Sequence, residues 1–478
     1  MPQSFKKTYE ENAAYFDRIF GIGTNYDFMG RERIIANRRA RFYFVDGFAN
    51  TAVMDRLFIY LAELDTLNNV SDAKDFAAKY LPHTEATVQH DVDAFVYSVM
   101  SGTMGIIIDG INEVGITIDT RMYPMRSVGQ SENDRVLRGA HDSFTETLKQ
   151  NTTLLRRRIR DTNLRLEHLK IGDVSGCDVV VSYIEGKADG KYVRELMSKL
   201  KKIKVDTLTL GQQSLAECLI KRGWYDPFPK FRFTERPDAA AAHLLEGNVI
   251  ILVDTSPEAM ILPTCLLDFM QESNDYYFPP LTGSYMRLLR YIVFTLALLL
   301  TPTWYLFISH EAWIPEWLSF ITVDTECNLP ILLQLYLVEA ALDGMKLASM
   351  NTPSSLNNTF GVVGGLILGD FAVQIGWFVP EVIVYMAFAA IANFSQSSYE
   401  LGYAMKFMRI ILLTTTAIGG LVGYILGLVI IVTLVATNKT ANGKRNYLYP
   451  LIPFNAKALK RLVVRERLKT KDGNTRLS

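Results

Sequence analysis

The stretch IILLTTTAIGGLVGYILGLVIIVTLVA at positions 410–436 holds 27 residues without a single charge. About 20 apolar residues in a helix, which rises about 1.5 Å per residue, cross a hydrocarbon core of ~30 Å. The stretch therefore predicts a helix that spans a membrane with some tilt. Three earlier segments have a similar apolar character: 291–308, 360–379 and 380–397.

Averages over the whole chain conceal this division. The 478 residues carry a net charge of +0, with a mean hydropathy of +0.11, because a polar first part offsets an apolar second part. The N-terminal residues MPQSFKKTYEENAAYF lack the apolar core of a signal peptide. We therefore predict a multi-domain fold, in which an N-terminal cytosolic α/β domain precedes an all-α transmembrane bundle at 285–437 and a basic cytoplasmic tail at 438–478.

Charge placement predicts the orientation of the bundle. The chain after residue 436 holds 11 Lys or Arg and only two acids, whereas the loop 309–328 holds four acids and no Lys or Arg. Cytoplasmic loops carry the excess of basic residues, so both termini are expected in the cytoplasm and the number of crossings is expected to be even. The simplest count is four: 291–308, 360–379, 380–397 and 410–436. The segment 329–350 stays open as an interfacial helix, a re-entrant helix or a further span.

The polar part of the chain repeats itself. FVDGFAN at 44–50 matches YIEGKAD at 183–189, and the runs 106–109 and 251–254 follow at an offset of 145. Each unit reads as strand, helix, connecting segment, helix and hairpin, which would bury one small sheet under helices. We expect α/β units at 30–130 and 170–284, with Asp46 and Glu185 at equivalent strand ends. A helical extension at 1–29 precedes them, and a linking helix at 131–169 joins them.

Two basic clusters each leave two interpretations open. Arg156, Arg157, Arg158 and Arg160 could dock phosphates, or they could form a solvated or salt-bridged face between the units. In the tail, 456–470 alternates apolar and basic residues. Basic residues at a membrane surface attract anionic lipid, so this segment predicts either lipid binding or an anchor for the topology.

A search for catalytic chemistry finds no site. The chain has six His and no GxGxxG, Walker A, GxSxG or HExxH motif. Its four Cys lie far apart without a CxxC pair, which argues against a zinc site or a disulfide framework. The acid in FVDG and its repeat either binds a metal or caps a turn, and the second interpretation is favoured. We therefore expect no enzyme activity, cofactor, metal or nucleic-acid partner.

Polar residues within the apolar part are the candidate functional residues. An ionisable group inside a membrane is tolerated only where it faces protein or water. The candidate ion path comprises Glu339, Asp343, Asp370, Gln374 and Asn393. The alternative is hydrogen bonding between helices, with Asp370 paired to Lys346 or Arg409 inside one chain. Gly419, Gly423 and Gly427 recur every four residues and predict close helix packing.

Several motifs resemble those of a known family, the GerA family of spore germination proteins, over nearly the whole chain. The motifs are RG at 138–139, FTE at 144–146, LLRRRI at 154–159, YIEG at 183–186, PFP at 227–229, TERPD at 234–238, LLEG at 244–247, YY at 276–277 and RLLRY at 287–291. NNTFG at 357–361 and NFSQSSY at 393–399 depart from the receptor A subunits and are similar to a sporulation-specific paralogue. The resemblance implies a multi-pass protein of the endospore inner membrane.

The resemblance also implies a function. Family A subunits are similar to oligomeric channels, of pentameric form, that release monovalent cations during germination together with other germination membrane proteins. A channel subunit is therefore the favoured hypothesis. The alternative is a non-conducting scaffold that docks other germination proteins. A secondary transporter is disfavoured because the spans are few and no inverted repeat is visible.

Overall fold

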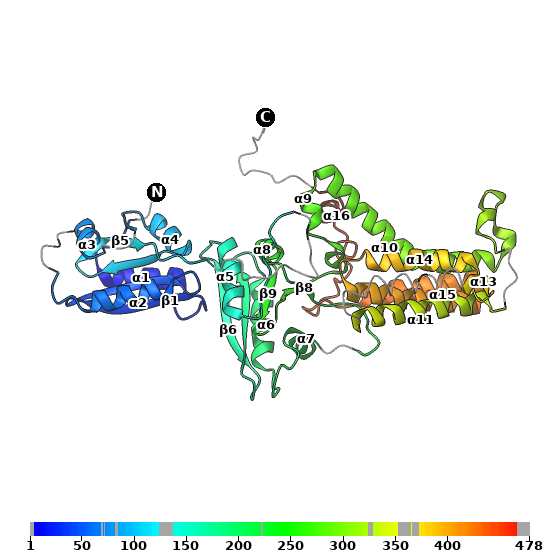
Figure 1. The fold of residues 1–478 in the computed structure, drawn as a ribbon, viewed down its shortest axis with the longest axis horizontal. Coiled ribbons are helices and arrows are strands. Elements are labelled where there is room, and N and C mark those ends of the chain that lie inside the picture. Colours follow the sequence, from blue (N-terminus) through cyan, green and yellow to red (C-terminus); the bar gives the residue numbers. More distant parts are fainter. Residues whose placement is uncertain are drawn as a thin grey trace. The chain divides into compact units, whose positions relative to one another are not determined.

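The computed structural model describes residues 4–67, 70, 72–81, 85–123, 136, 138–220, 223–323, 328–351, 365 and 372–465. The chain divides into two compact units. The α/β unit comprises Met1–Arg222 and Phe231–Pro263, and the helical unit comprises Gly223–Lys230 and Thr264–Ser478. Figure 1 shows strands in the first unit and long helices in the second.

The α/β unit contains two five-stranded antiparallel sheets of the same topology. The first has the order β1-β2-β4-β5-β3 and the second β6-β7-β9-β10-β8. Asp46 directly follows β2 and Glu185 directly follows β7, so the predicted repetition is confirmed. The strands are β1 (Phe28–Ile35), β2 (Arg38–Val45), β3 (Ala86–Gln89), β4 (Met104–Ile108), β5 (Ile111–Ile118), β6 (Leu164–Ile171), β7 (Cys177–Ile184), β8 (Arg232–Thr234), β9 (Val249–Val253) and β10 (Ala259–Leu262).

Helices cover both faces of the first sheet. Successive side chains of a strand point to opposite faces, and β2 follows this rule: Phe42 and Phe44 belong to one core cluster, whereas Tyr43 and Val45 belong to another. The first cluster includes residues of α2 (Thr51–Ala62) and α3 (Ala73–Tyr80), and the second includes residues of α1 (Tyr9–Phe20) and α4 (Val92–Met100).

The segment between the sheets corrects one prediction. Within the described residues of the helix predicted at 131–169, the helical part is α5 (Leu148–Arg158), because Ile159 takes an extended backbone and β6 begins at Leu164. Leu164 and Leu166 are both buried two residues apart, which is the period of a strand. Helix α5 shares the core of the second sheet and also contacts the first repeat, through ion pairs of Arg156 with Asp27 and of Lys149 with Asp46. The other helices of this repeat are α6 (Gly190–Lys201), α7 (Gln212–Leu219) and α8 (Pro237–Glu246).

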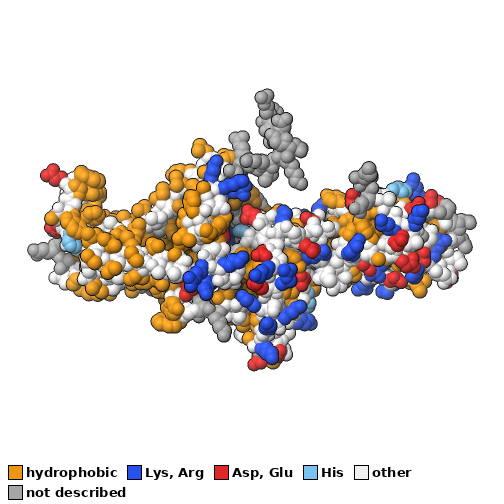
Figure 2. Space-filling model, turned by 180° about the vertical axis from the view of Figure 1, so that it is seen from behind, with side chains coloured by type: hydrophobic (Ala, Val, Ile, Leu, Met, Phe, Trp, Pro, Cys, Tyr) orange, Lys and Arg blue, Asp and Glu red, His pale blue; other side chains and the backbone are white. Residues whose placement is uncertain are grey.

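The helical unit carries an apolar surface. In the part of the chain that the structure describes, two helical segments are long and apolar enough to cross a membrane: α10 (Pro280–Ile308) and α15 (Tyr399–Thr437). Figure 2 shows hydrophobic side chains over most of the visible face of this unit, while charged side chains gather on the α/β unit. The remaining elements are η1 (Leu266–Met270), α9 (Asn274–Tyr277), η2 (Glu311–Trp313), η3 (Glu316–Ile321), α11 (Ile331–Asn351), α13 (Ala372–Gln374), α14 (Pro380–Phe394) and α16 (Ala456–Val463).

The run 410–436 is not one straight helix as predicted. Gly420 has φ 54° and ψ −133°, which interrupts α15. The second half then folds back along the first, because a Cβ on Gly423 would lie 1.9 Å from the Thr415 carbonyl oxygen and one on Gly427 would lie 2.8 Å from Leu412 Cδ1. In a continuous helix, residues 15 positions apart would be separated by about 22 Å. The run is therefore a helical hairpin, and its glycines allow the two halves to approach closely.

The ends of the helices fall into two groups, called here two levels, which lie toward opposite ends of the helical unit. Lys346, near the end of α11, lies over Tyr399 and Tyr403 at the start of α15. Ala372 instead packs in the cluster that contains Trp304 of α10 and Leu413 of α15. The described segments that end at Asn351 and resume at Ala372 therefore lie toward opposite ends of the unit. Most of the predicted span 360–379 lies outside the described residues.

Candidate functional site

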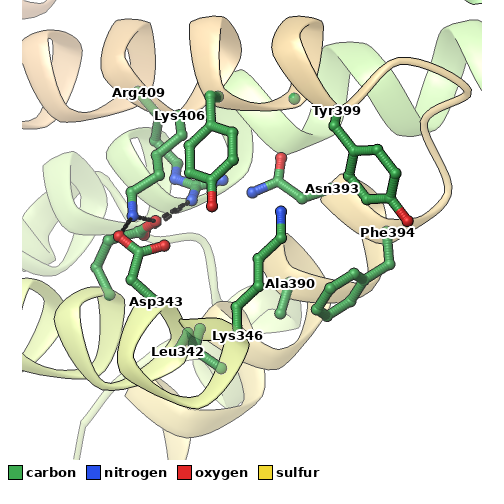
Figure 3. Close-up of a pocket in the computed structure, with 12 residues that line it drawn as sticks. Leu342, Asp343, Lys346, Ala390, Asn393, Phe394, Tyr399, Lys406 and Arg409 are labelled. Carbon is green, nitrogen blue, oxygen red and sulfur yellow. Dashed lines mark hydrogen bonds and ion pairs between the residues drawn. The ribbon is translucent and has the colours of Figure 1, made fainter. Parts of the chain in front are cut away.

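A cluster of charged side chains lies between helices of the apolar unit. Helix α11 contributes Glu339, Asp343 and Lys346, which the spacing of four and three residues places on one face, as predicted. Helix α15 contributes Lys406 and Arg409. These side chains line a small pocket together with Asn393 from α14, and Figure 3 shows Asp343, Lys346, Lys406 and Asn393 converging on it.

Glu339 and Arg409 form the buried end of the cluster. The Arg409 Nη2 atom donates to both carboxylate oxygens of Glu339, at 2.9 and 2.8 Å. The Nη1 atom of Arg409 donates to the carbonyl oxygen of Ala297 on α10 at 3.0 Å. The Arg409 and Glu339 side chains are only 3 and 11% exposed. This pair therefore joins three helices within one chain.

Lys406 connects the buried end to a more exposed end. Its Nζ atom lies 3.3 Å from Glu339 Oε1 and also forms an ion pair with Asp343. Exposure of the side chains rises from 7% at Lys406 to 43% at Asp343. The charges thus form a continuous series from the packed interior to a cavity of about 40 Å³, which is room for a few waters.

Lys346 stands apart from this series. Among the described residues, Lys346 forms no ion pair within 4.0 Å, because the acids of the pocket pair with Lys406 and Arg409. Its Nζ atom lies instead 4.3 Å from the ring centroid of Tyr403, 5.0 Å from that of Tyr399 and 6.0 Å from that of Phe394. Figure 3 shows the Lys346 side chain extending toward Asn393 and Tyr399. Asn393 Oδ1 is buried and has no hydrogen-bond partner among the described residues.

The structure brings together some of the predicted residues and separates others. Glu339, Asp343 and Asn393 line the same pocket. Gln374 is exposed in α13, which belongs to the other level of the unit. Asp370 lies outside the described residues, and Arg409, offered as its partner, pairs with Glu339.

Lys406 is the functional candidate that sequence reasoning missed. It stands four residues before the uncharged run and three residues before Arg409, so the two basic residues share a helix face. Glu339 and Asp343, four residues apart, likewise share one face of α11. This complementarity of two charged helix faces was a usable signal.

The candidate features of the α/β unit have structural roles. Arg156 is fully buried and pairs with Asp27, with its Nε atom 2.6 Å from Asp27 Oδ2. This favours the salt-bridged interpretation of the arginine cluster over phosphate docking. The acids of the repeated motif also form ion pairs, Asp46 with Lys149 at 2.7 Å and Glu185 with Arg165 at 2.8 Å. Within the described part of the chain, no group of three His, Cys, Asp or Glu could hold a metal.

Comparison with known proteins identifies the family. The family model described as "Bacillus/Clostridium GerA spore germination protein" matches residues 14–477. Stage V sporulation protein AF of Bacillus subtilis is 35% identical over 459 residues, covering 95% of this chain and 92% of that protein. The chain belongs to the GerA family.

Other relatives of this GerA-family protein carry germination names. Spore germination protein KA of Bacillus subtilis is 28% identical over 415 residues, which cover 86% of this chain and 75% of the relative. A solved structure, the N-terminal domain of the A subunit of the Bacillus megaterium spore germinant receptor GerK3, is 27% identical, with a TM-score of 0.43, and covers 55% of this chain and 96% of that one.

Membership in the family bears on activity. The relatives are named as germination and sporulation proteins rather than as enzymes, and the GerA-family protein described here is not an enzyme. Its long apolar helices fit association with a membrane. The charged pocket of the helical unit is therefore a candidate site for binding or transport, not for catalysis.

Proposed function

We propose that this GerA-family protein is an integral membrane component of the spore germination machinery and a subunit of an oligomeric channel for monovalent cations. The observation that carries the proposal is the series of charged side chains from Glu339 through Lys406 to Asp343, set between apolar helices. Charged groups at the centre of a membrane helix cost about 2.5–3.5 kcal/mol each on insertion scales, and they mark ion pathways.

The pairing of the charges suggests that this conformation is closed. Glu339 and Asp343 are both engaged by basic residues of the same chain. An acid that is paired with a basic residue attracts a cation less strongly than an unpaired acid does. The electric fields of the two opposite charges cancel at a distance. Conduction would therefore require movement of α11 relative to α15, which would turn the acids toward an axis shared by several copies, five in the form that the resemblance implies. Rings of such acids favour cations over anions.

The proposed topology places both termini in the cytoplasm of the spore. The hairpin in α15, together with helix α11, favours more crossings than the four first predicted. The number stays even, as the basic tail predicts. A cysteine at Thr322 should react with a membrane-impermeant reagent from outside and one at Lys457 should not. The reverse pattern would contradict this orientation.

A specific observation supports a second candidate, a non-conducting scaffold. The Glu339–Arg409 pair and its bond to Ala297 join α10, α11 and α15, as a purely structural network would. In this view the repeated α/β sheets dock other germination proteins and α16 contacts anionic lipid.

Reconstitution separates the two candidates. The full-length protein in liposomes loaded with a potassium-sensitive dye should pass potassium without a coupled solute gradient. Flux that needs a second solute would indicate a transporter. An absence of flux from liposomes that contain correctly inserted protein would contradict the channel and favour the scaffold.

A further inference from the structure

The environment of Lys346 differs from that of the other basic residues in the pocket. Lys406 and Arg409 take both acids of the pocket. The Lys346 ammonium faces three aromatic rings from α14 and α15, with centroids between 4.3 and 6.0 Å away. It has no ion pair within the part of the chain that the structure describes, although Asp343 precedes it by three residues on the same helix.

The groups around Lys346 are those that bind a monovalent cation. A cation within about 6 Å of a ring centroid is attracted by the negative face of the ring, and cages of several rings hold alkylammonium ions. An amide oxygen adds an uncharged acceptor, and Asn393 Oδ1 in this pocket is buried with no hydrogen-bond partner among the described residues. No acid needs to be present for such a site to hold one positive charge.

A lysine head group is, chemically, an alkylammonium ion on a tether. We propose that Phe394, Tyr399, Tyr403 and Asn393 form a binding site for a free monovalent cation of the alkylammonium class, which Lys346 fills from within the chain. The tethered ammonium acts as a plug: while it lies in the cage, a free cation is excluded by occupancy and by like charge. This inference rests on the proposed function only for its consequence in flux, and the binding site stands or falls by itself.

The plug also gives a reason for the charge balance of the pocket. Three basic residues and two acids line it, so the pocket has an excess of one positive charge when Lys346 is in place. Withdrawal of Lys346 leaves the two acids balanced by Lys406 and Arg409, with the cage vacant. One additional monovalent cation would then restore the original charge of the site.

Binding is tested first, on the full-length protein in detergent. Lys346→Met keeps an unbranched side chain, one atom shorter, and removes its charge. Thermal unfolding is measured with increasing methylammonium chloride and with sodium chloride at equal ionic strength. A ligand that binds only the folded state raises Tm in a saturable manner, and at about ten times the Kd we expect a rise of roughly 2–4 °C for Lys346→Met.

Matched variants define the result. The wild type and Lys439→Met, which removes an exposed lysine of the same charge outside the pocket, should show no rise specific to methylammonium. Lys346→Met combined with Tyr403→Leu should lose the rise because the nearest ring is gone. If Lys346→Met does not fold, Lys346→Gln replaces it. A flat response of the folded Lys346 variant, or an equal response to sodium, would overturn the proposal.

Flux then separates this proposal from the channel itself. In liposomes, Lys346→Met should pass methylammonium several-fold faster than the wild type, and Lys346→Arg should match the wild type because it keeps the plug charged. Specific binding without flux from any variant would refute the channel and leave the site. Flux in the wild type without binding in the Lys346 variants would refute the site and leave the channel.

Discussion

Each unit of the protein buries an arginine–carboxylate pair, and the two pairs differ in what surrounds them. In the α/β unit, Arg156 and Asp27 are 0 and 1% exposed. The Arg156 guanidinium also donates to the carbonyl oxygens of Asp161 and Leu164, and the ring of Phe28 covers it at 5.0 Å. In the helical unit, the pair of Arg409 and Glu339 continues through Lys406 to a half-exposed acid.

The difference shows that burial of a charge does not by itself mark a functional site. A pair whose hydrogen-bonding capacity is filled on every side stabilises one conformation. A pair that belongs to a series leading to water can exchange partners, because a third charge stands within reach. The arrangement around Lys406 therefore provides what the arrangement around Arg156 lacks, an alternative partner for each charge.

The largest expected effect comes from breaking the fully buried pair of Arg156 and Asp27, called here the sealed pair. Arg156→Met should lower the free energy of unfolding of the α/β unit by about 3–5 kcal/mol, because it leaves Asp27 as a buried charge without a partner. Hydrogen exchange of the β2 and β7 amides in the full chain measures this loss directly. The five tryptophans at 224, 304, 313, 317 and 377 all belong to the helical unit, so tryptophan fluorescence reports on the other unit.

A partly exposed pair of the same helix provides the control. Arg158 lies 2.6 Å from Asp142, with side chains 21 and 28% exposed. Arg158→Met should cost no more than about 1 kcal/mol, as surface ion pairs do. If Arg156→Met and Arg158→Met lowered the free energy of unfolding equally, complete burial would not distinguish the two pairs.

A smaller effect is expected in the charged cluster of the helical unit. This open cluster comprises Glu339, Asp343, Lys406 and Arg409. Glu339→Gln should destabilise the helical unit by about 2–3 kcal/mol, because Arg409 loses a charged acceptor while Asp343 still balances Lys406. It should also lower cation flux. Tryptophan fluorescence and membrane abundance are to be measured on the same samples.

The double variant separates structure from conduction. Glu339→Gln with Arg409→Gln restores the charge balance and should recover most of the abundance without recovering flux. Normal abundance with normal flux for Glu339→Gln would refute a role for Glu339 in an ion path. Asp370→Asn is still predicted to lower cation flux, and the same measurements of abundance and flux test it.

The sequence predicted the repeated sheets because the repetition is local. FVDG and YIEG each end a strand, and the offset of 145 places Ile106 and Ile251 in equivalent strands β4 and β9. It also indicated Glu339 and Asp343, because an acid in an apolar helix is conspicuous. These signals depend on residues that are close together in the chain.

The features that sequence reasoning missed depend on contacts between distant segments. The turn at Gly420 lies inside an uncharged run whose hydropathy is the same on both sides, so composition does not reveal it. The choice of Glu339 rather than Asp370 as the partner of Arg409 depends on how α11 packs against α15. The prediction of a linking helix was wrong beyond Arg158. Over a short stretch, a pattern of apolar and basic residues fits a helix and a strand equally well.

The hairpin offers a test of the packing that positions Lys406 and Arg409. Gly423→Ala should destabilise the helical unit by about 1–3 kcal/mol, since its Cβ would meet the Thr415 carbonyl oxygen and the two halves would have to separate. Gly419→Ala is the matched control, because no atom lies within 4 Å of an added Cβ among the neighbours described there. Tryptophan fluorescence during thermal unfolding compares the two, and equal behaviour would contradict a close-packed hairpin.

The smallest expected effect concerns a buried group that stays uncharged. Burial, together with the charge of nearby Arg232, lowers the pKa of His243 in the α/β unit to about 3. The nearest acid, Glu246, is 70% exposed and 4.0 Å away. In the unfolded chain the imidazole titrates near pH 6.5, so the unfolded state binds the additional proton as the pH falls below that value. The contribution of His243 to stability is therefore complete above pH 6.5 and is lost progressively toward pH 3.

Between pH 7 and pH 5 this loss amounts to about 1–2 kcal/mol. Hydrogen exchange of the β9 amides, which lie beside α8, should show a stability that falls over this range in the wild type and falls less in His243→Gln. A sealed interior thus responds to acid by losing stability, whereas the open cluster of the helical unit can admit water and exchange partners. If the pH dependence of β9 exchange were the same in both proteins, the interior around His243 would be accessible to protons, and the contrast between the sealed and the open unit would not hold.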